Sequence, residues 1–138
     1  MRSSLEVKSN ASTNGPTIVA FDVQPDGTVK NQRDFGKLEA GGVGDGMAID
    51  TEGRLYVTSA PGVQVLSPEG RHLGLIPTPR NTISVAFSGR DKRTLYIVGS
   101  GALDSGGTEF RAPQGVRNNA KTIYKIAMLA EGFGGRAK

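Results

Sequence analysis

The sequence predicts an all-β protein that forms part of a β-propeller, and three observations lead to this fold class. The 138 residues include 20 glycines and 7 prolines but only 36% hydrophobic residues, a composition that is typical of short strands joined by frequent turns. Apolar stretches recur, since "GRLYVTS" at 53–59 returns as "RTLYIVG" at 93–99, 40 positions later. The turns recur as well, with Pro-Asp-Gly at 25–27 and Pro-Glu-Gly at 68–70. Four antiparallel strands in every 40 to 45 residues or so are the signature of propeller blades.

The first repeat unit is expected to supply three strands, at 4–8, 17–23 and 28–35. Its opening stretch "SSLEVKS" at 3–9 is a weaker copy of "GRLYVTS", which is the second strand of the cycle. The turn at 25–27 carries the glycine that a tight hairpin needs. Because no first strand of the cycle precedes 4–8, we expect this blade to be incomplete.

The second unit is predicted to be a complete blade over 46–77. Its four strands are expected at 46–50, 54–59, 62–67 and 71–77. A β-sandwich would also have many short strands, but it would not repeat a four-strand cycle in register.

The third unit, over 83–127, is predicted to have strands at 83–88, 94–99 and 122–127. "SVAFS" at 84–88 repeats "GMAID" of the second unit, and "TIYKI" at 122–126 repeats "TIVAF" of the first. The remaining residues, 128–138, are expected to form a tail whose end, "EGFGGRAK" at 131–138, is mobile.

The whole chain is therefore predicted to be a single partial propeller domain of about two and a half four-stranded blades over 1–138. Tyr56, Tyr96 and Tyr124 occupy equivalent strand positions, so we expect all three to pack between blades. A closed propeller needs at least four blades. We therefore expect open blade edges, through which the chain could associate with itself.

Composition excludes several classes of function. The chain has no cysteine, which rules out disulfides, thiolate metal sites and a cysteine nucleophile. The net charge of +4 comes from basic residues scattered along the chain rather than clustered in a stripe, so no nucleic-acid partner is expected. No signal peptide and no apolar run of membrane-spanning length is present, which predicts a soluble, by default cytoplasmic, protein with no membrane partner.

The motif "GGVGDGMAID" at 41–50 places Asp45 between two glycines, directly ahead of an apolar run. A turn facing solvent would explain this pattern, and so would an acid aimed into a site at the end of a strand. The glycines are not a phosphate-binding loop, because their spacing differs from G-x-G-x-x-G and they lead into a strand rather than a helix.

Four stretches together resemble the C-terminal half of the gluconolactonase and senescence-marker-protein (regucalcin-like) family. They are "TIVAFDVQPDGTVKNQRDF", "GDGMAIDTEGRLYVTSAPGVQVLSPEGRHLGLIPTP", "VAFSGRDKRTLYIVGSG" and "TIYKIAML", and the resemblance runs from about residue 4 to residue 130. It implies a six-bladed ring and a divalent-metal-dependent lactone hydrolase. The expected metal is Ca²⁺, with Zn²⁺, Mn²⁺ or Mg²⁺ as alternatives, and the expected ligand is a lactone or a sugar acid.

The resemblance also assigns a role to Asp45. Asp45-Gly46-Met47 matches the family's D-G-M motif, whose aspartate is a metal ligand and is thought to help activate the attacking water. A carboxylate oxygen is a hard ligand suited to Ca²⁺ or Mg²⁺. We therefore expect Asp45 to be both metal ligand and catalytic residue.

The long connection at 100–120 is the second place where we expect functional residues. In an up-and-down blade, the connections between second and third strands emerge at the same end as the connections between blades, so 100–120 should share an end with Asp45. Long connections of this kind are often functional. The candidate substrate-binding residues on it are Arg111, Arg117, Asn118 and Asn119, with Asp104 and Glu109 as weaker candidates. The single histidine, His72, is expected at the opposite end, which argues against a Ser-His-Asp arrangement with Asp45.

Two functions remain open at this point. The family's other metal ligands, a glutamate and the asparagine of an N-G motif on earlier blades, have no counterpart in this chain. We therefore expect the C-terminal portion of a lactone hydrolase that is inactive alone, since one carboxylate cannot fill the shell of six to eight oxygens that Ca²⁺ takes. The alternative is a non-catalytic half-propeller that acts as a binding or self-assembly module.

Overall fold

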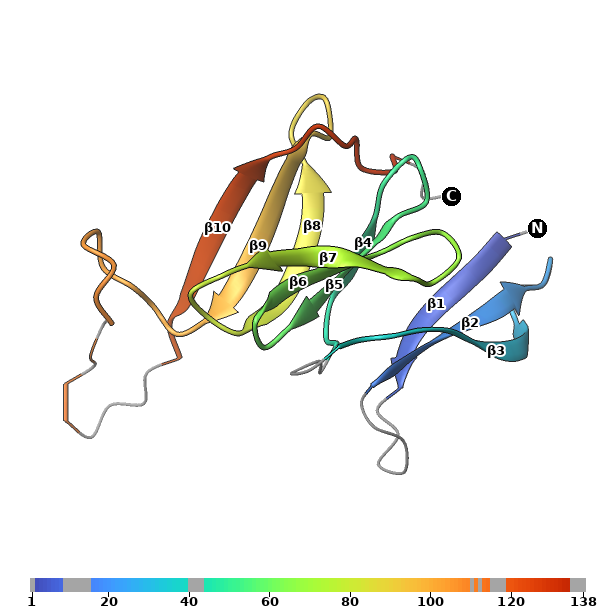
Figure 1. The fold of residues 1–138 in the computed structure, drawn as a ribbon, viewed down its shortest axis with the longest axis horizontal. Helices are drawn as coiled ribbons and strands as arrows, with labels where there is room; N and C mark the ends of the chain where they lie inside the picture. Colours follow the sequence, from blue (N-terminus) through green and yellow to red (C-terminus); the bar gives the residue numbers. More distant parts are fainter. Residues whose placement is uncertain are drawn as a thin grey trace.

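The computed structural model describes residues 2–8, 16–39, 44–109, 111, 113–114 and 119–134. These residues form three antiparallel sheets that lie side by side, with the first sheet at the right of Figure 1, the second in the centre and the third at the left. The strand orders are β1-β2-β3, β4-β5-β6-β7 and β10-β9-β8. Within each sheet, every strand is thus hydrogen-bonded to its neighbours along the chain, as in propeller blades.

The strands lie close to the predicted positions. Their bounds are β1 Arg2–Lys8, β2 Thr17–Val23, β3 Val29–Lys37, β4 Met47–Ile49, β5 Leu55–Ser59, β6 Gly62–Leu66, β7 His72–Pro77, β8 Thr82–Ser88, β9 Thr94–Ser100 and β10 Lys121–Ala127. The prediction of an all-β partial propeller is confirmed. Among the described residues there is no helix long and apolar enough to cross a membrane.

The first and second sheets meet through an apolar cluster and a close backbone contact. The buried members of the cluster are Ile18, Leu38, Leu55, Val57 and Leu66. Gly70 lies in the turn before β7 at φ +82°, and a Cβ atom built there would be 1.7 Å from the carbonyl oxygen of Phe35. Gly70 therefore adopts the positive φ angle that the turn needs, and its lack of a side chain lets the two sheets approach each other.

The second and third sheets meet through a separate cluster, whose buried members are Tyr56, Val63, Val85, Leu95 and Ile97. The Tyr56 ring meets the Phe87 ring edge to face, with centroids 5.0 Å apart and planes at 89°. Because side chains alternate along a strand, β5 sends Leu55 and Val57 toward the first sheet and Tyr56 toward the third. This strand is buried on both faces.

The same alternation makes one tyrosine prediction wrong. Tyr56 and Tyr124 do pack between the second and third sheets. In β9, however, Leu95 and Ile97 face the second sheet, so Tyr96 points to the other face of the third sheet and is 38% exposed. Equivalent positions in two sheets therefore differ in burial, since the far face of the third sheet has no described sheet packed on it.

Thr82 joins the second and third sheets by buried hydrogen bonds. Its hydroxyl oxygen accepts from the Ser59 backbone N–H at 2.9 Å and lies 2.9 Å from the carbonyl oxygens of both Ser59 and Gly62, to which it can donate. Thr82 is 4% exposed and Ser59 is 1% exposed. In this dry environment, losing the hydroxyl would leave the Ser59 N–H unsatisfied.

The residues after β10 form a strap across the hairpins of the third and second sheets, and not a free tail. Met128 N–H donates to the Arg93 carbonyl at 2.8 Å, and Gly132 N–H donates to the Lys92 carbonyl at 2.9 Å. The strap then reaches the second sheet, where Phe133 N–H donates to the Ile49 carbonyl at 3.0 Å. The expectation of a mobile end over 131–138 is wrong for 131–133, whose backbone is hydrogen-bonded to both hairpins.

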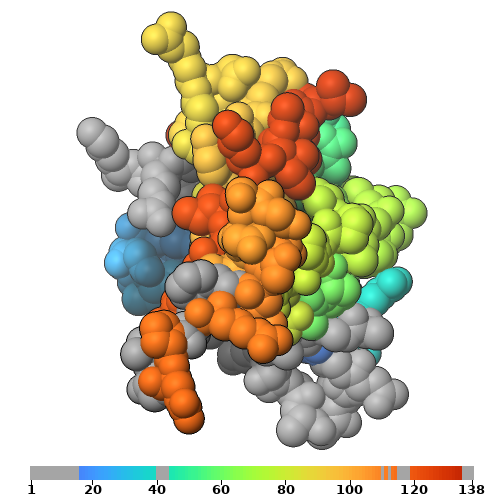
Figure 2. Space-filling model, turned by 90° about the vertical axis from the view of Figure 1, so that its left-hand side faces the viewer, coloured from blue at the N-terminus to red at the C-terminus, as the bar shows by residue number. Residues whose placement is uncertain are grey.

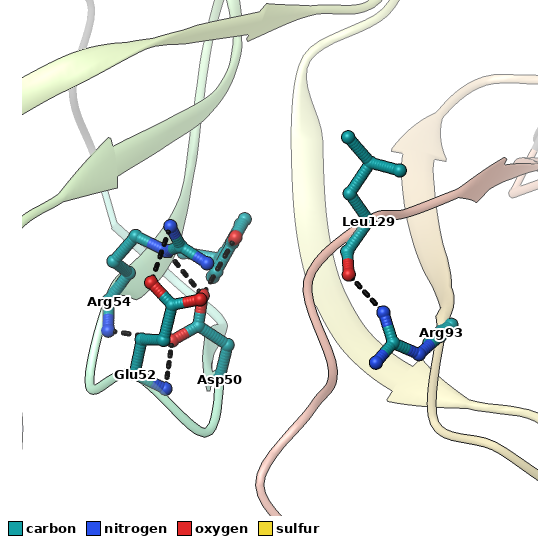
Figure 3. A network of polar contacts seen from close by, with 6 residues as sticks. Asp50, Glu52, Arg54, Arg93 and Leu129 are labelled. Atoms are coloured by element: carbon teal, nitrogen blue, oxygen red, sulfur yellow. Dashed lines mark hydrogen bonds and ion pairs between the residues drawn. The ribbon is translucent and has the colours of Figure 1, made fainter.

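A buried carboxylate stabilises the β4–β5 hairpin beneath this strap (Figure 3). Asp50 is 1% exposed and accepts four hydrogen bonds: from the backbone N–H groups of Glu52 and Arg54, from Arg54 Nε at 2.6 Å and from the Tyr56 hydroxyl at 3.1 Å. Figure 3 also shows Arg93 donating to the carbonyl of Leu129, which holds the start of the strap. Asp50 is thus a structural acid with all its hydrogen bonding used inside the fold.

Replacing Thr82 with valine is expected to destabilise the protein by about 1–3 kcal/mol, because it removes a buried hydrogen-bond partner at nearly constant volume. Urea unfolding followed by circular dichroism measures the change. Thr94→Val is the matched control, since the Thr94 hydroxyl makes no hydrogen bond to a described residue and is half-buried. Equal losses in the two variants would contradict the role of Thr82.

Stability is expected to fall at high pH through Tyr56. Burial, followed by the adjacent Asp50 carboxylate, raises the pKa of Tyr56 from 10.0 to about 12. The unfolded phenol ionises first, so this contribution to stability is fully present below about pH 10 and is lost as the pH rises toward 12. In urea titrations between pH 8 and 11.5, the advantage of wild type over Tyr56→Phe should shrink as the pH rises. Parallel pH profiles for the two proteins would refute this assignment.

Candidate functional site

A hollow at the lower end of the second and third sheets in Figure 1 brings several chain connections together. Its volume is about 390 Å³. The residues that line it come from the β3–β4 connection, the β5–β6 hairpin, the β7–β8 connection with the start of β8, and the end of β9; they are Gly44, Asp45, Ala60, Asn81, Thr82, Ile83 and Ser100. The hollow therefore lies across the interface between two sheets.

Asp45 is at the edge of this hollow, and its backbone is held by a buried threonine. The Thr58 hydroxyl accepts from the N–H groups of Asp45 at 3.1 Å and Gly46 at 2.8 Å, and Thr58 N–H donates to the Gly46 carbonyl at 3.0 Å. Thr58 is completely buried, whereas Asp45 is exposed. The Asp45 carboxylate makes no hydrogen bond or ion pair with a described residue. Asp45 therefore has a fixed backbone and an exposed carboxylate that is available to a ligand.

Gly46 is required by the approach of the third sheet. A Cβ atom at this position would lie 2.9 Å from Ser84 Cα and 3.2 Å from the Ile83 carbonyl oxygen. Contacts this short with backbone atoms can be relieved only by moving β4 or β8. Gly46, the glycine directly after Asp45, thus allows β8 to lie close to the Asp45 backbone.

The described candidate residues on the β9–β10 connection do not line the hollow. Arg111 and Asn119 are both exposed, and neither is among the described residues that line the hollow. Arg117 and Asn118 lie outside the described residues. Figure 2 shows the described part of this connection, in orange, on the lower half of the face that contains β10, opposite the yellow hairpin at about residue 90. Their predicted roles in substrate binding remain predictions.

The first part of that connection is an ordered turn, so the weaker candidates there have structural partners. Asp104 accepts hydrogen bonds from the backbone N–H groups of Gly106 at 2.9 Å and Thr108 at 2.8 Å. Glu109 forms an ion pair with Arg80 at 3.5 Å, which links this connection to the β7–β8 connection. His72 lies at the start of β7, 3.4 Å from Glu39, and does not line the hollow.

Asn81 and Ser100 are the hollow residues that motif analysis did not find. Neither belongs to a recognisable motif, and Asn81 lies in an ordinary-looking "TPRNT" stretch. Ser100 is the first residue of the 100–120 connection, which the topology rule had already placed at the same end as Asp45. The β7–β8 connection emerges at that end too, so the same rule applied to it would have included Asn81.

The donor set for a metal is small within the described chain. Asp45 contributes a carboxylate, which is a hard donor suited to Ca²⁺ or Mg²⁺. Among the described residues there is no group of three or more His, Cys, Asp and Glu side chains that could hold a metal ion. The kind of donor therefore fits a hard divalent cation, and Asp45 would supply one ligand of its shell.

Comparison with known proteins places the chain in a family. A family profile described as "SMP-30/Gluconolactonase/LRE-like region" matches residues 10–101, which is about two thirds of the chain. The chain belongs to this family. The suggested resemblance is thus confirmed, and the Asp45 motif lies within the matched region.

Individual relatives agree with this assignment. The chain is similar to lactonohydrolase oryH from Aspergillus oryzae, with 34% identity over 93 residues that cover 67% of this chain and 20% of the relative. It is also similar to regucalcin from Sus scrofa, with 38% identity over 117 residues that cover 79% of this chain and 36% of the relative. The chain therefore spans about a fifth to a third of the length of these curated relatives.

A solved structure shows the same fold. The structure of a luciferin-regenerating enzyme superposes with a TM-score of 0.66 at 24% identity, over 86% of this chain and 40% of the other. At this identity the likeness supports the arrangement of the sheets and does not transfer a reaction.

Replacing Gly46 with alanine is expected to destabilise the protein by about 1–3 kcal/mol, because the added methyl group meets backbone atoms of β8. Gly74→Ala in β7 is the matched control, since a Cβ atom there has nothing within 4 Å. Urea unfolding compares the two variants. If Gly46→Ala were as stable as Gly74→Ala, the close contact between β4 and β8 would be refuted.

Proposed function

We propose that the chain forms part of the active site of a divalent-metal-dependent lactone hydrolase, with Asp45 as a ligand of the metal. The observation that carries this proposal is the position of Asp45. In a chain of the SMP-30/gluconolactonase/LRE-like family, this exposed carboxylate without a described partner lies on a hollow between two sheets. The lactonohydrolase and gluconolactonase names of the family indicate the reaction class.

Two acids of the second sheet show why Asp45 is the better candidate. Asp50 is five residues further along the same motif, but it is buried and accepts four hydrogen bonds within its own hairpin. Asp45 has the opposite properties, with its backbone fixed by Thr58 and its carboxylate open. A bound cation needs an acid of the second kind.

In this proposal Asp45 has two tasks at one carboxylate. One oxygen binds a hard divalent cation, with Ca²⁺ as the first choice and Zn²⁺, Mn²⁺ or Mg²⁺ as alternatives. When bound, such a cation polarises a lactone carbonyl and lowers the pKa of an adjacent water. The other oxygen would accept a proton from the attacking water, and Thr58 holds the Asp45 backbone that carries the carboxylate.

The remaining candidates are residues for binding the substrate. Arg111, Arg117, Asn118 and Asn119 on the β9–β10 connection are proposed to contact the lactone or the sugar acid. One carboxylate from this chain fills only a fraction of a Ca²⁺ shell. We therefore expect the chain alone to bind the cation weakly, with a dissociation constant of about 10⁻³ M, and to show no lactone hydrolysis.

Titration with Ca²⁺, followed by ¹H–¹⁵N NMR, tests the metal site. In wild type the amide signals of Gly44 to Met47 should shift, and Asp45→Ala should abolish the shift because the carboxylate ligand is lost. Asp34→Ala is the matched control, since Asp34 is an exposed acid in β3 and does not line the hollow. A lactone-hydrolysis assay on the same samples measures turnover.

Two results would contradict the proposal. The first is no response of the Asp45 region to Ca²⁺, Zn²⁺, Mn²⁺ or Mg²⁺ in wild type. The second is an equal response in Asp45→Ala. Either result would favour the non-catalytic binding module instead.

A further inference from the structure

The polar side chains near the hollow fall into two groups. Thr58, Ser59 and Thr82 are buried, and their hydroxyl groups all hydrogen-bond to the backbone. The side chains of Asp45, Asn81 and Ser100 also belong to the lining, but none of the three makes a hydrogen bond to a described residue. The first group holds the fold together, whereas the second has no hydrogen-bond partner among the described residues.

The backbone that carries Asn81 and Ser100 is fixed. Ser100 N–H donates to the Asn81 carbonyl at 2.8 Å, which ties the two residues to each other. On one side the Thr78 hydroxyl donates to the Arg80 carbonyl at 2.6 Å, and on the other the Thr122 hydroxyl donates to the Gly101 carbonyl at 2.8 Å. The two side chains, which have no described hydrogen-bond partner, are therefore carried by a backbone that is fixed by hydrogen bonds. A fixed backbone of this kind is typical of a preorganised binding site.

The chemistry of these two side chains differs from that of Asp45. An ionised carboxylate only accepts hydrogen bonds, whereas an amide and a hydroxyl can both donate and accept. A sugar hydroxyl also donates and accepts, so Asn81 and Ser100 match a polyhydroxylated ring, and Asp45 matches a cation. The volume of about 390 Å³ is within the usual range for small-molecule sites, about 300–1,000 Å³.

We propose that Asn81 and Ser100 bind the hydroxyl groups of the sugar lactone, or of the aldonate that its hydrolysis produces, in the hollow that Asp45 also lines. This inference rests on the proposed function. It adds two specificity-determining residues from the third sheet, so the substrate would be held across the same interface that Thr82 braces.

The experiment uses gluconate as the probe, in the presence of Ca²⁺, with the full 138-residue chain. The side-chain NH₂ signals of Asn81, assigned by their loss in Asn81→Ala, should shift when gluconate is added after Ca²⁺ is saturating. Asn81→Ala and Ser100→Ala should each weaken gluconate binding about 3- to 10-fold, the loss of one hydrogen bond. Both should leave the Ca²⁺ response of the Asp45 region unchanged.

Ser88→Ala is the matched control, because Ser88 is exposed at the other end of β8 and should not alter binding. The NMR spectra of all variants also report whether each is folded. If either hollow variant is unfolded, Asn81→Asp and Ser100→Gly replace it in the same titration.

The outcomes separate this inference from the proposed function. Wild-type gluconate binding that persists undiminished in Asn81→Ala and Ser100→Ala would overturn the inference alone. So would Asn81 signals that respond to Ca²⁺ but not to gluconate, which would make Asn81 a metal ligand. Failure of wild type to bind either Ca²⁺ or gluconate would overturn the proposed function and the inference with it.

Discussion

The contact between the second and third sheets determines the geometry of the candidate site. Asp45 and Ala60 reach the hollow from the second sheet, while Asn81, Thr82, Ile83 and Ser100 reach it from the third. Their relative positions therefore depend on the apolar cluster around Tyr56 and Leu95, on the buried hydroxyl of Thr82 and on the absence of a side chain at Gly46. If the second sheet moved relative to the third, Asp45 would move away from Asn81 and Ser100, even with all three residues unchanged.

The two ends of the sheets use their polar groups in opposite ways. At the hairpin end Asp50 is buried and fully hydrogen-bonded, and the strap from Met128 to Phe133 joins two neighbouring hairpins. At the other end the buried hydroxyls brace the backbone and leave the carboxylate, amide and hydroxyl of the hollow without described partners. The polar groups of the hairpin end thus stabilise the fold. The polar groups of the hollow have no partner among the described residues, so a ligand could form hydrogen bonds with them.

Membership of the SMP-30/gluconolactonase/LRE-like family and the geometry of Asp45 are two independent observations that bear on the proposed role of Asp45. The family match concerns the order of residues along the chain, whereas the contrast between Asp45 and Asp50 comes from burial and hydrogen bonding. The chain covers 20% to 36% of the curated relatives described above, and its described residues supply one carboxylate to the hollow. Ca²⁺ prefers six to eight oxygen ligands, so a Ca²⁺ site at Asp45 would need donors beyond those that the described residues supply.

The sequence by itself determined the strands, their order and the Asp45 motif, because alternation, turn glycines and a repeat of about 40 residues are local properties that need no knowledge of the neighbouring sheet. Burial on the two faces of each sheet depended on the tertiary structure. Tyr56 and Tyr96 have equivalent local patterns but face a packed sheet and an open face respectively, and 128–133 has no strand pattern yet is held by backbone hydrogen bonds to distant hairpins. Asn81 and Ser100 are 19 residues apart and belong to no motif. Only the packing of the third sheet against the second brings them to the same hollow as Asp45. Residues from different connections meet there because the sheets pack together, and the local sequence does not determine that packing.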